Sequence, residues 1–265
     1  MFRDQYPAAW TLHANTIRWP FNTMELDEEL WVEPLFKEYP SVPSVALPSR
    51  SLTRPIGEAL RERISCRSFS QIPLALDALG TILAVAYGVQ GEVTFGSRQH
   101  LERPVPSGGG LYPLELYPIV RRVDGLAPGI YHYAPLTHAL EQIKVAQFST
   151  TFISQLFMNQ PYLSEAAAII LMTAVLERSM HKYGDRGYRY ILLECGHAAQ
   201  NICLAAACMD LGSLPIGGFF DAYLAELVGI DLEEEVIIYG MAVGPATTSA
   251  SDRVGRRNIG VLIGA

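Results

Sequence analysis

The sequence is poor in charge and lacks the signatures of several common protein classes. Only 18% of its 265 residues are charged, which is the opposite of the balance of a disordered chain. No apolar run reaches the roughly 18 residues of a transmembrane helix, and the N-terminal MFRDQYPAAW lacks the apolar core of a signal peptide. We therefore expect a folded protein without a membrane partner.

Cysteine is scarce, and its spacing excludes the common redox and zinc motifs. The four cysteines are Cys66, Cys195, Cys203 and Cys208, and no two of them form a Cys-x-x-Cys pair. Three fall in one apolar stretch, where a thiol behaves as a small hydrophobic group. The pattern predicts reduced thiols in a cytoplasmic protein and no metal site.

Basic residues are in the minority, and apolar residues are abundant. Lys and Arg number 20 against 27 Asp and Glu, so the net charge is −7. Nucleic-acid-binding proteins usually carry a basic surface, so this balance argues against nucleic acid as a partner. Apolar residues make up 49% of the chain, enough for one large core.

The pattern of apolar residues divides the chain into an N-terminal arm, residues 1–50, and one domain, residues 51–265. The Pro/Ser-rich stretch 40–52 is the predicted boundary. Helices are predicted at 53–62, 74–87, 148–156, 188–211 and 222–228, with Gly212 as the stop of the long one. Strands are predicted at 116–123, 129–133, 138–143, 167–175 and 236–243, and a polar loop at 92–102. The hairpin at 129–143 requires antiparallel pairing, so we predict an α+β fold.

Two guanidinium groups and a hydroxyl alternate at Arg63, Ser65 and Arg67. Residues two apart in an extended segment face the same way. The three groups can therefore grip a phosphate, which arginine binds through two N–H groups at once. Taken alone, the pattern is more often a solvated, arginine-rich helix end.

Two glycine-rich strings allow a backbone to approach a flat ligand closely. Pro106-Ser107-Gly108-Gly109-Gly110 is not a phosphate-binding Walker loop, because no Gly-Lys-Ser/Thr follows, but its glycines leave room for a ligand. Pro215-Ile216-Gly217-Gly218-Phe219 offers backbone N–H groups to a ligand edge. An ordinary turn is the alternative for each string.

Lys182 and Tyr183 precede the long predicted helix, in what the composition indicates is a polar loop. A lysine beside a tyrosine can accept a proton where burial or a second cation lowers the pKa of the lysine. Glu194 and His197 are spaced like one half of a di-iron ligand set, but the second copy that such a site needs is missing. We therefore predict that His197 is a hydrogen-bonded helix residue.

The order of these motifs resembles the nitroreductase superfamily, and within it the SagB-type branch of McbC-like azoline oxidases. The resemblance covers roughly residues 53–245. Besides the phosphate-gripping string and the two glycine strings, it includes Lys-Tyr-x-x-Arg-Gly-Tyr-Arg at 182–189 and Glu-x-Gly-His-x-x-Gln-Asn at 194–201.

The resemblance implies an FMN-dependent oxidoreductase with a nitroreductase-like fold: an antiparallel-containing sheet flanked by helices, and a long interface helix in a homodimer. Arg63, Ser65 and Arg67 would hold the phosphate and ribityl chain of FMN. Ser107, Gly108 and Gly109 would line its ring, and Pro215, Ile216, Gly217 and Gly218 would lie against it. Arg256 or Arg257 would complete the phosphate site. Gly217 stands where general nitroreductases often carry Glu, which weakens any expectation of nicotinamide-type substrates.

Lys182 and Tyr183 match the catalytic pair of that branch. The implied reaction converts a thiazoline or oxazoline in a modified peptide to a thiazole or oxazole, with a cyclodehydratase as a possible partner. Two other functions stay open. One is an NAD(P)H-dependent nitro or quinone reductase on the same fold. The other is a non-catalytic flavin-binding subunit of a peptide-modifying complex, which the aromatic arm would dock to its partner.

Overall fold

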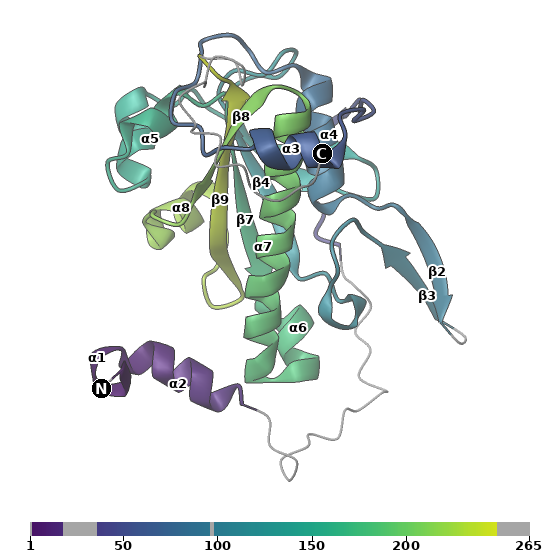
Figure 1. Ribbon diagram of the computed structural model, residues 1–265, viewed down its shortest axis with the longest axis vertical. Helices are drawn as coiled ribbons and strands as arrows, with labels where there is room; N and C mark the ends of the chain where they lie inside the picture. Colours follow the sequence, from purple (N-terminus) through teal and green to yellow (C-terminus); the bar gives the residue numbers. More distant parts are fainter. Residues whose placement is uncertain (1, 18–35, 96–97, 248–265) are drawn as a thin grey trace.

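The computed structural model describes residues 2–17, 36–95 and 98–247. Their centre is a seven-stranded sheet in the order β1-β6-β5-β4-β7-β9-β8 (Figure 1), and every neighbouring pair is antiparallel. The strands are β1 (Ser44–Ala46), β4 (Leu114–Val120), β5 (Gly129–Ala134), β6 (Ala139–Val145), β7 (Ala168–Val175), β8 (Leu211–Ile216) and β9 (Glu235–Pro245). The predicted α+β fold, with the hairpin β5–β6, is confirmed.

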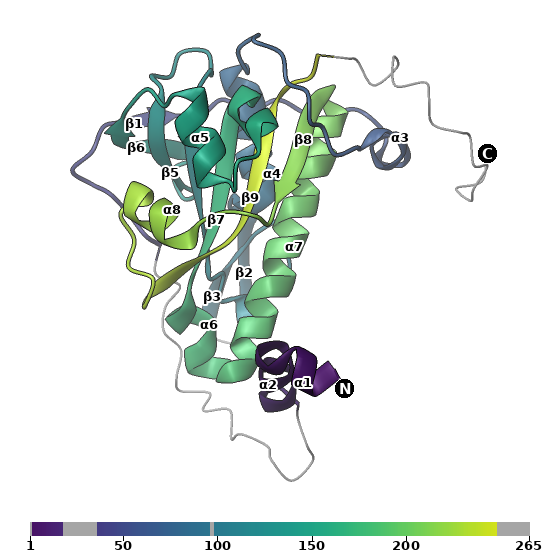
Figure 2. The same ribbon diagram turned by 90° about the vertical axis from the view of Figure 1, so that its left-hand side faces the viewer.

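Helices cover both faces of this sheet (Figure 2). The helices α4 (Leu76–Tyr87) and α7 (Asp185–Cys208) lie on one face, and α5 (Thr150–Leu156) and α8 (Asp221–Val228) lie on the other. The short α6 (Leu176–Tyr183) joins β7 to α7, and α3 (Ile56–Glu62) lies at the far end of α7.

The central strand β7 shows why the sheet is buried on both sides. Ile170 and Met172 belong to the core under α4 and α7, whereas Ile169 and Leu171 belong to the core under α5 and α8. Successive side chains of a strand point to opposite faces, so a continuous apolar run supplies both cores. The strand predicted from that run is confirmed.

The predicted end of the long helix is wrong. The helix α7 ends at Cys208, and Gly212 lies inside β8. A Cβ on Gly212 would stand 2.6 Å from Sγ of Cys66, so the glycine permits close strand packing and does not cap the helix. The strand escaped prediction because it contains both a glycine and Pro215, which usually mark turns.

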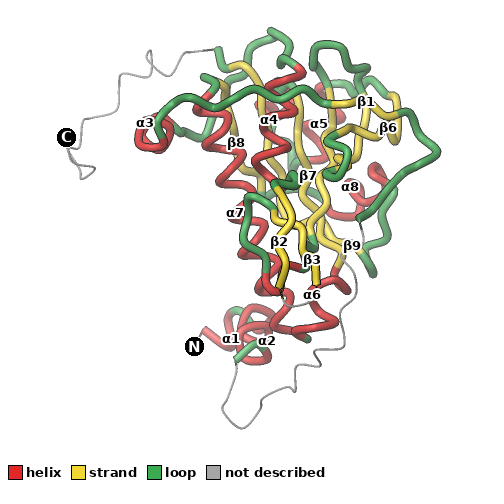
Figure 3. The backbone as a smooth tube through the Cα atoms, turned by 90° about the vertical axis from the view of Figure 1, so that its right-hand side faces the viewer, coloured by secondary structure: helices red, strands yellow, loops and turns green. Residues whose placement is uncertain are grey.

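The segment predicted as a polar loop at 92–102 is also different. It forms a two-stranded hairpin of β2 (Gly91–Phe95) and β3 (Arg98–Glu102), which extends away from the main sheet (Figures 1 and 3). A half-buried strand is recognised by alternating apolar and polar residues, and this segment is too polar to show that pattern.

The N-terminal region is more regular than predicted where the structure describes it. It forms α1 (Phe2–Gln5) and α2 (Pro7–Asn15), which lie at the foot of α7 (Figure 3), and β1, which pairs with β6. Leu47, just after β1, is buried in the main core. The division into an arm and a domain at residue 50 stays a prediction.

The helix α7 is long and apolar enough to cross a membrane by length and composition alone. However, 56% of its most apolar stretch is buried inside the protein, where it packs on α4, β8 and β9. It is therefore the core helix of this fold.

Candidate functional site

Lys182 and Tyr183 occupy the last turn of α6, so the predicted polar loop is a helix end. They point at the glycine string that precedes β4. A Cβ on Gly109 would stand 2.6 Å from the hydroxyl oxygen of Tyr183 and 3.3 Å from Nζ of Lys182, and its φ of 69° also favours glycine. The structure therefore brings the predicted base pair and the Ser107–Gly109 string together.

An aromatic residue of α7 completes this group. The ring of Tyr190 packs on Gly108, where a Cβ would stand 3.2 Å from it, and meets the ring of Tyr183 edge-on at 5.0 Å between centroids. Burial, reinforced by the neighbouring Tyr190, raises the pKa of Tyr183. Tyr183 is therefore a phenol at neutral pH, so Lys182 is the candidate proton acceptor of the pair.

Behind the glycine string lies a buried carboxyl group that the sequence did not single out for this place. Glu194 points inward from α7 and accepts a 2.5 Å hydrogen bond from the Tyr87 hydroxyl and another from Ser107. The Ser107 oxygen in turn accepts a 2.9 Å bond from the backbone N–H of Tyr112. Burial raises the pKa of Glu194 to about 7. The Ser107 hydroxyl is thus engaged inside the protein, and its loop offers a ligand mainly backbone.

The helix α6 is fixed to the sheet by a buried ionic cluster. Arg178, one turn before Lys182, contacts Glu115 at 2.6 Å. His132 lies between Glu115 and Glu141, with its two ring nitrogens 2.9 and 2.7 Å from their carboxylate oxygens. The two carboxyl groups hold the imidazole ring in place between the strands. Burial opposes ionisation of Glu115, but His132 and Arg178 outweigh it and hold the pKa of Glu115 below its usual value.

The phosphate-gripping string lies at the other end of α7. Ser65 forms a parallel bridge with Ser213 of β8, and the Cys66 N–H donates to the Ser213 carbonyl at 2.8 Å. Pro215 and Ile216 follow in β8, so the predicted turn begins as a strand. The structure therefore brings the Arg-x-Ser-x-Arg and Pro-Ile-Gly-Gly strings together as neighbours.

This end of α7 suits an anionic, flat ligand, because it has positive charge that no described carboxylate neutralises and free space beside its glycines. Within residues 36–95 and 98–247, neither Arg63 nor Arg67 forms an ion pair with a carboxylate. A Cβ on Gly217 would meet nothing closer than 3.8 Å. The Gly218 carbonyl is held by Gln160 at 3.2 Å. Uncompensated guanidinium groups suit a phosphate. Arg256 and Arg257 lie outside the described residues.

The two ends are far apart within one chain. Tyr190 packs on Gly108, whereas Cys203, also on α7, hydrogen-bonds Ser213 beside Ser65. The thirteen residues from Tyr190 to Cys203 span about 20 Å of helix. A single copy therefore does not gather all the predicted site residues around one ligand.

Between the two ends, α7 presents an exposed strip on the side away from the sheet. Leu192 is 40% exposed and Leu193 is 55% exposed. Gly196, His197 and Gln200 continue the strip. His197 lies in α7 as predicted, but its side chain has no hydrogen-bond partner among the described residues. The two leucines form a small exposed apolar patch on this side of α7.

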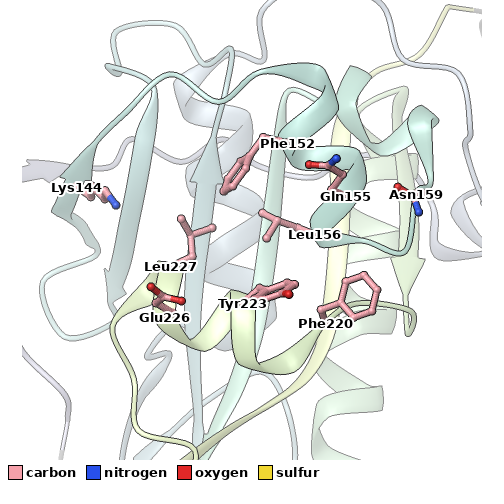
Figure 4. Close-up of a pocket in the computed structure, with 9 residues that line it drawn as sticks. All are labelled: Lys144, Phe152, Gln155, Leu156, Asn159, Phe220, Tyr223, Glu226 and Leu227. Atoms are coloured by element: carbon pink, nitrogen blue, oxygen red, sulfur yellow. The ribbon is translucent and has the colours of Figure 1, made fainter.

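A cavity lined by described residues contains none of the predicted site residues. It measures about 670 Å³ and lies between α5 and α8, on the face of the sheet opposite α7 (Figure 4). Phe152, Leu156 and Tyr223 form its apolar part. Its nearest link to the site is Phe220, which follows the Pro-Ile-Gly-Gly-Phe string directly.

An antiparallel sheet with a long helix across it, and glycine strings at both ends of that helix, defines the class of nitroreductase-like oxidoreductases. The family model "Nitroreductase family" matches residues 60–245. The chain belongs to this family.

Curated relatives point the same way. A nitroreductase-family protein of Methanocaldococcus jannaschii is 36% identical over 65% of this chain and 83% of its own length. The microcin B17-processing protein McbC of Escherichia coli is 30% identical over 49% of this chain and 50% of its own. The chain thus spans about half of McbC.

Solved structures share the fold. A nitroreductase-family protein from Anabaena variabilis has a TM-score of 0.69 and 28% identity, over 89% of this chain and 45% of that one. The E. coli microcin synthetase McbBCD complex, with truncated pro-MccB17 bound, has a TM-score of 0.61 and 23% identity, over 90% of this chain and 87% of that one. The resemblance to the McbC-like branch is confirmed.

Proposed function

We propose that this protein is an FMN-dependent oxidoreductase that dehydrogenates thiazoline or oxazoline rings of a modified peptide to thiazoles or oxazoles. The observation that carries the proposal is the convergence of Lys182 and Tyr183 on the backbone of Gly109. The similarity to McbC, a microcin-processing protein, supports a peptide substrate. A cyclodehydratase that forms the azoline is the proposed partner, and four free cysteines fit the proposed cytoplasmic location.

The working unit in this proposal is a homodimer. Two copies that pair their α7 helices antiparallel through the exposed strip at 192–200 place Tyr190 of one copy beside Cys203 of the other. The Ser107–Gly109 string of one copy then meets the Arg-x-Ser-x-Arg and Pro-Ile-Gly-Gly strings of the second. Two-fold symmetry makes two such sites, each of which takes residues from both copies.

The residues fit FMN when they are combined in this way. Arg63, Ser65 and Arg67 would hold the phosphate and ribityl chain, and the backbone of Pro215–Gly218 would run along one edge of the ring. The Ser107–Gly109 backbone of the second copy would cover the ring. Arg256 is the proposed further phosphate ligand.

Dehydrogenation removes a hydride and a proton from neighbouring atoms of the azoline ring. Bound FMN supplies the hydride acceptor. Lys182 is the proposed proton acceptor, and Tyr183 donates a hydrogen bond that orients the ring. The ionic cluster around Arg178 keeps α6 in place, so both groups stay aimed at the loop. Dioxygen is the proposed final oxidant.

The test is the double variant Lys182→Ala/Tyr183→Phe with an azoline-containing peptide. Loss of general base catalysis typically costs 10²- to 10⁴-fold in rate, so azole formation should fall by at least about 100-fold while FMN stays bound. Lys144→Ala, on the opposite face of the sheet, is the matched control. Azole formation at the wild-type rate in the double variant would refute the assignment.

The relative from M. jannaschii favours a second candidate, an NAD(P)H-dependent nitro or quinone reductase. Mixing the flavin-loaded protein with NADPH in a stopped-flow instrument separates the two. Rapid bleaching of the flavin would favour the reductase. A colourless protein that cannot be reconstituted with FMN would leave only the non-catalytic subunit.

A further inference from the structure

Among the described residues, the helix α2 lies at the surface. None of its nine residues is buried, and Trp10 is 37% and Leu12 38% exposed. Its C-terminal end is tied to α7, where Arg186 donates to the carbonyl of Thr16 and Arg189 donates to the hydroxyl of Thr16 and approaches Nδ1 of His13 at 3.5 Å. A free helix of this length is marginal in water, so a surface that covers it is expected.

An apolar groove lined by described residues lies at the opposite end of α7. It measures about 290 Å³. Its apolar lining comes from the loop before α3, from α4 and from the last turns of α7: Leu52, Ile56, Val85, Leu204, Ala205 and Cys208. Ile56 is 61% exposed, and Leu60 of α3 is 46% exposed.

The groove and the helix are arranged to meet across a two-fold axis. Figure 2 shows α2 and α3 at the two ends of α7, both beyond the side of α7 that faces away from the sheet. The antiparallel pairing that sets Tyr190 of one copy beside Cys203 of the other also sets Arg189 near Leu204 and Arg186 near Ala207. Leu204 and Cys208, on the same turns of α7, both line the groove. The residues that hold α2 therefore face the groove of the second copy.

We propose that α2 of one copy docks in this groove of the second copy, with Trp10 as its anchor. The proposal rests on the homodimer of the proposed function. It adds a role for the N-terminal helix: α3, which borders the groove, ends at Glu62, directly before Arg63, so the docked helix braces the phosphate-gripping string. Each cofactor site then depends on the N-terminus of the other copy.

Docking within one chain is excluded by distance. Arg189, which holds Thr16, and Cys208, which lines the groove, lie nineteen residues apart on α7, or about 28 Å. A large aromatic side chain that enters such a groove contributes strongly to an interface.

The native cysteines provide a direct test. Of the four, Cys66, Cys195 and Cys203 are buried, and only Cys208 is partly exposed, in the groove itself. Ala9→Cys and Thr11→Cys place a second thiol on either side of Trp10. A bismaleimide that is too short to join the new thiol to Cys208 of the same chain should link one of them to Cys208 of the other copy. The product is a covalent dimer on a denaturing gel.

Two controls isolate that link. Thr11→Cys combined with Cys208→Ser removes one of the two thiols, and Thr137→Cys places a thiol on the exposed turn between β5 and β6. Neither should give the covalent dimer. A protein that is dimeric and binds FMN, yet yields no link from either α2 position, would overturn the docking and leave the proposed function intact. A protein that stays monomeric would overturn both.

A double-mutant cycle gives a second readout. Trp10→Ala and Ile56→Asp should each raise the dissociation constants of the dimer and of FMN by about tenfold, as removal of an interface anchor does. Their effects should not add, because both remove one contact. Leu136→Ala, equally exposed but distant, should change neither constant. Additive effects would contradict a shared contact.

Discussion

The two ends of α7 differ in how their polar groups are satisfied. At the first end, Glu194, Ser107 and Tyr87 hydrogen-bond one another, and Lys182 and Tyr183 pack on a glycine loop. At the second, Arg63 and Arg67 have no carboxylate partner in the described part of the chain. The first end is built to hold a fixed geometry, which a catalytic group needs. The second keeps its charge free for an anion.

The variant expected to disturb the geometry of the first end most strongly is Gly109→Ala. The new methyl group would collide with the Tyr183 hydroxyl at 2.6 Å, and the φ of 69° would strain the backbone as well. Activity should fall by about 100-fold even in protein saturated with FMN, as displacements of catalytic groups by an ångström do. The measurement is the rate of azole formation at saturating peptide.

Gly57→Ala is the control for that variant. Gly57 lies in α3, where a Cβ would meet no atom within 4 Å. Alanine there should leave activity unchanged and raise stability by about 0.5–1 kcal/mol. An equal loss of activity in both variants would show that Gly109 has no special relation to Tyr183.

Glu194→Gln should change the pH dependence of stability. Burial raises the pKa of Glu194 from 4.5 to about 7 in the folded state, so the group binds its proton more tightly when folded. Its contribution to stability is complete below pH 4.5 and is lost as the pH rises towards 7. The loss amounts to roughly 3 kcal/mol.

The comparison of wild type and Glu194→Gln by urea unfolding at pH 5 and pH 8 measures this loss. The variant should lose less stability between the two pH values than the wild type. Identical pH dependence would mean that Glu194 ionises normally and that the Ser107 loop is not held by a buried acid. Glu177→Gln, on the surface, serves as the control.

Most of the fold could be predicted from periodicity, but the meeting of the site residues could not. The strand β7 and the helix α7 have long apolar patterns, whereas β8 is interrupted by Gly212 and Pro215. The motifs could be recognised one by one. The distance between the two groups of motifs is set by the length of α7. No single motif carries information about that distance.

The supporting groups of the site were harder still to find. Glu115, His132 and Glu141 come from three strands, and only the pairing of β4, β5 and β6 sets them side by side. Glu194 gave one signal that was available in the sequence: an acidic residue on the apolar face of α7, between Ile191 and Cys195 and in register with the buried side. A buried acid requires partners, so this position predicts a polar site behind the helix.

The mildest effects are expected at the second end of α7. Arg63→Ala and Arg67→Ala each remove one charge-assisted contact to a phosphate, which is worth about 1.5–3 kcal/mol. The dissociation constant of FMN, measured by quenching of flavin fluorescence, should rise by roughly tenfold to a hundredfold. Arg50→Ala, whose guanidinium already pairs with Asp77, should leave it unchanged. Because no carboxylate is left unpaired when Arg63 or Arg67 is removed, the unfolding temperature of the FMN-free protein should stay the same, unlike that of Glu194 variants. A loss of stability without a loss of FMN affinity would show that the two arginines are structural and that the phosphate lies elsewhere.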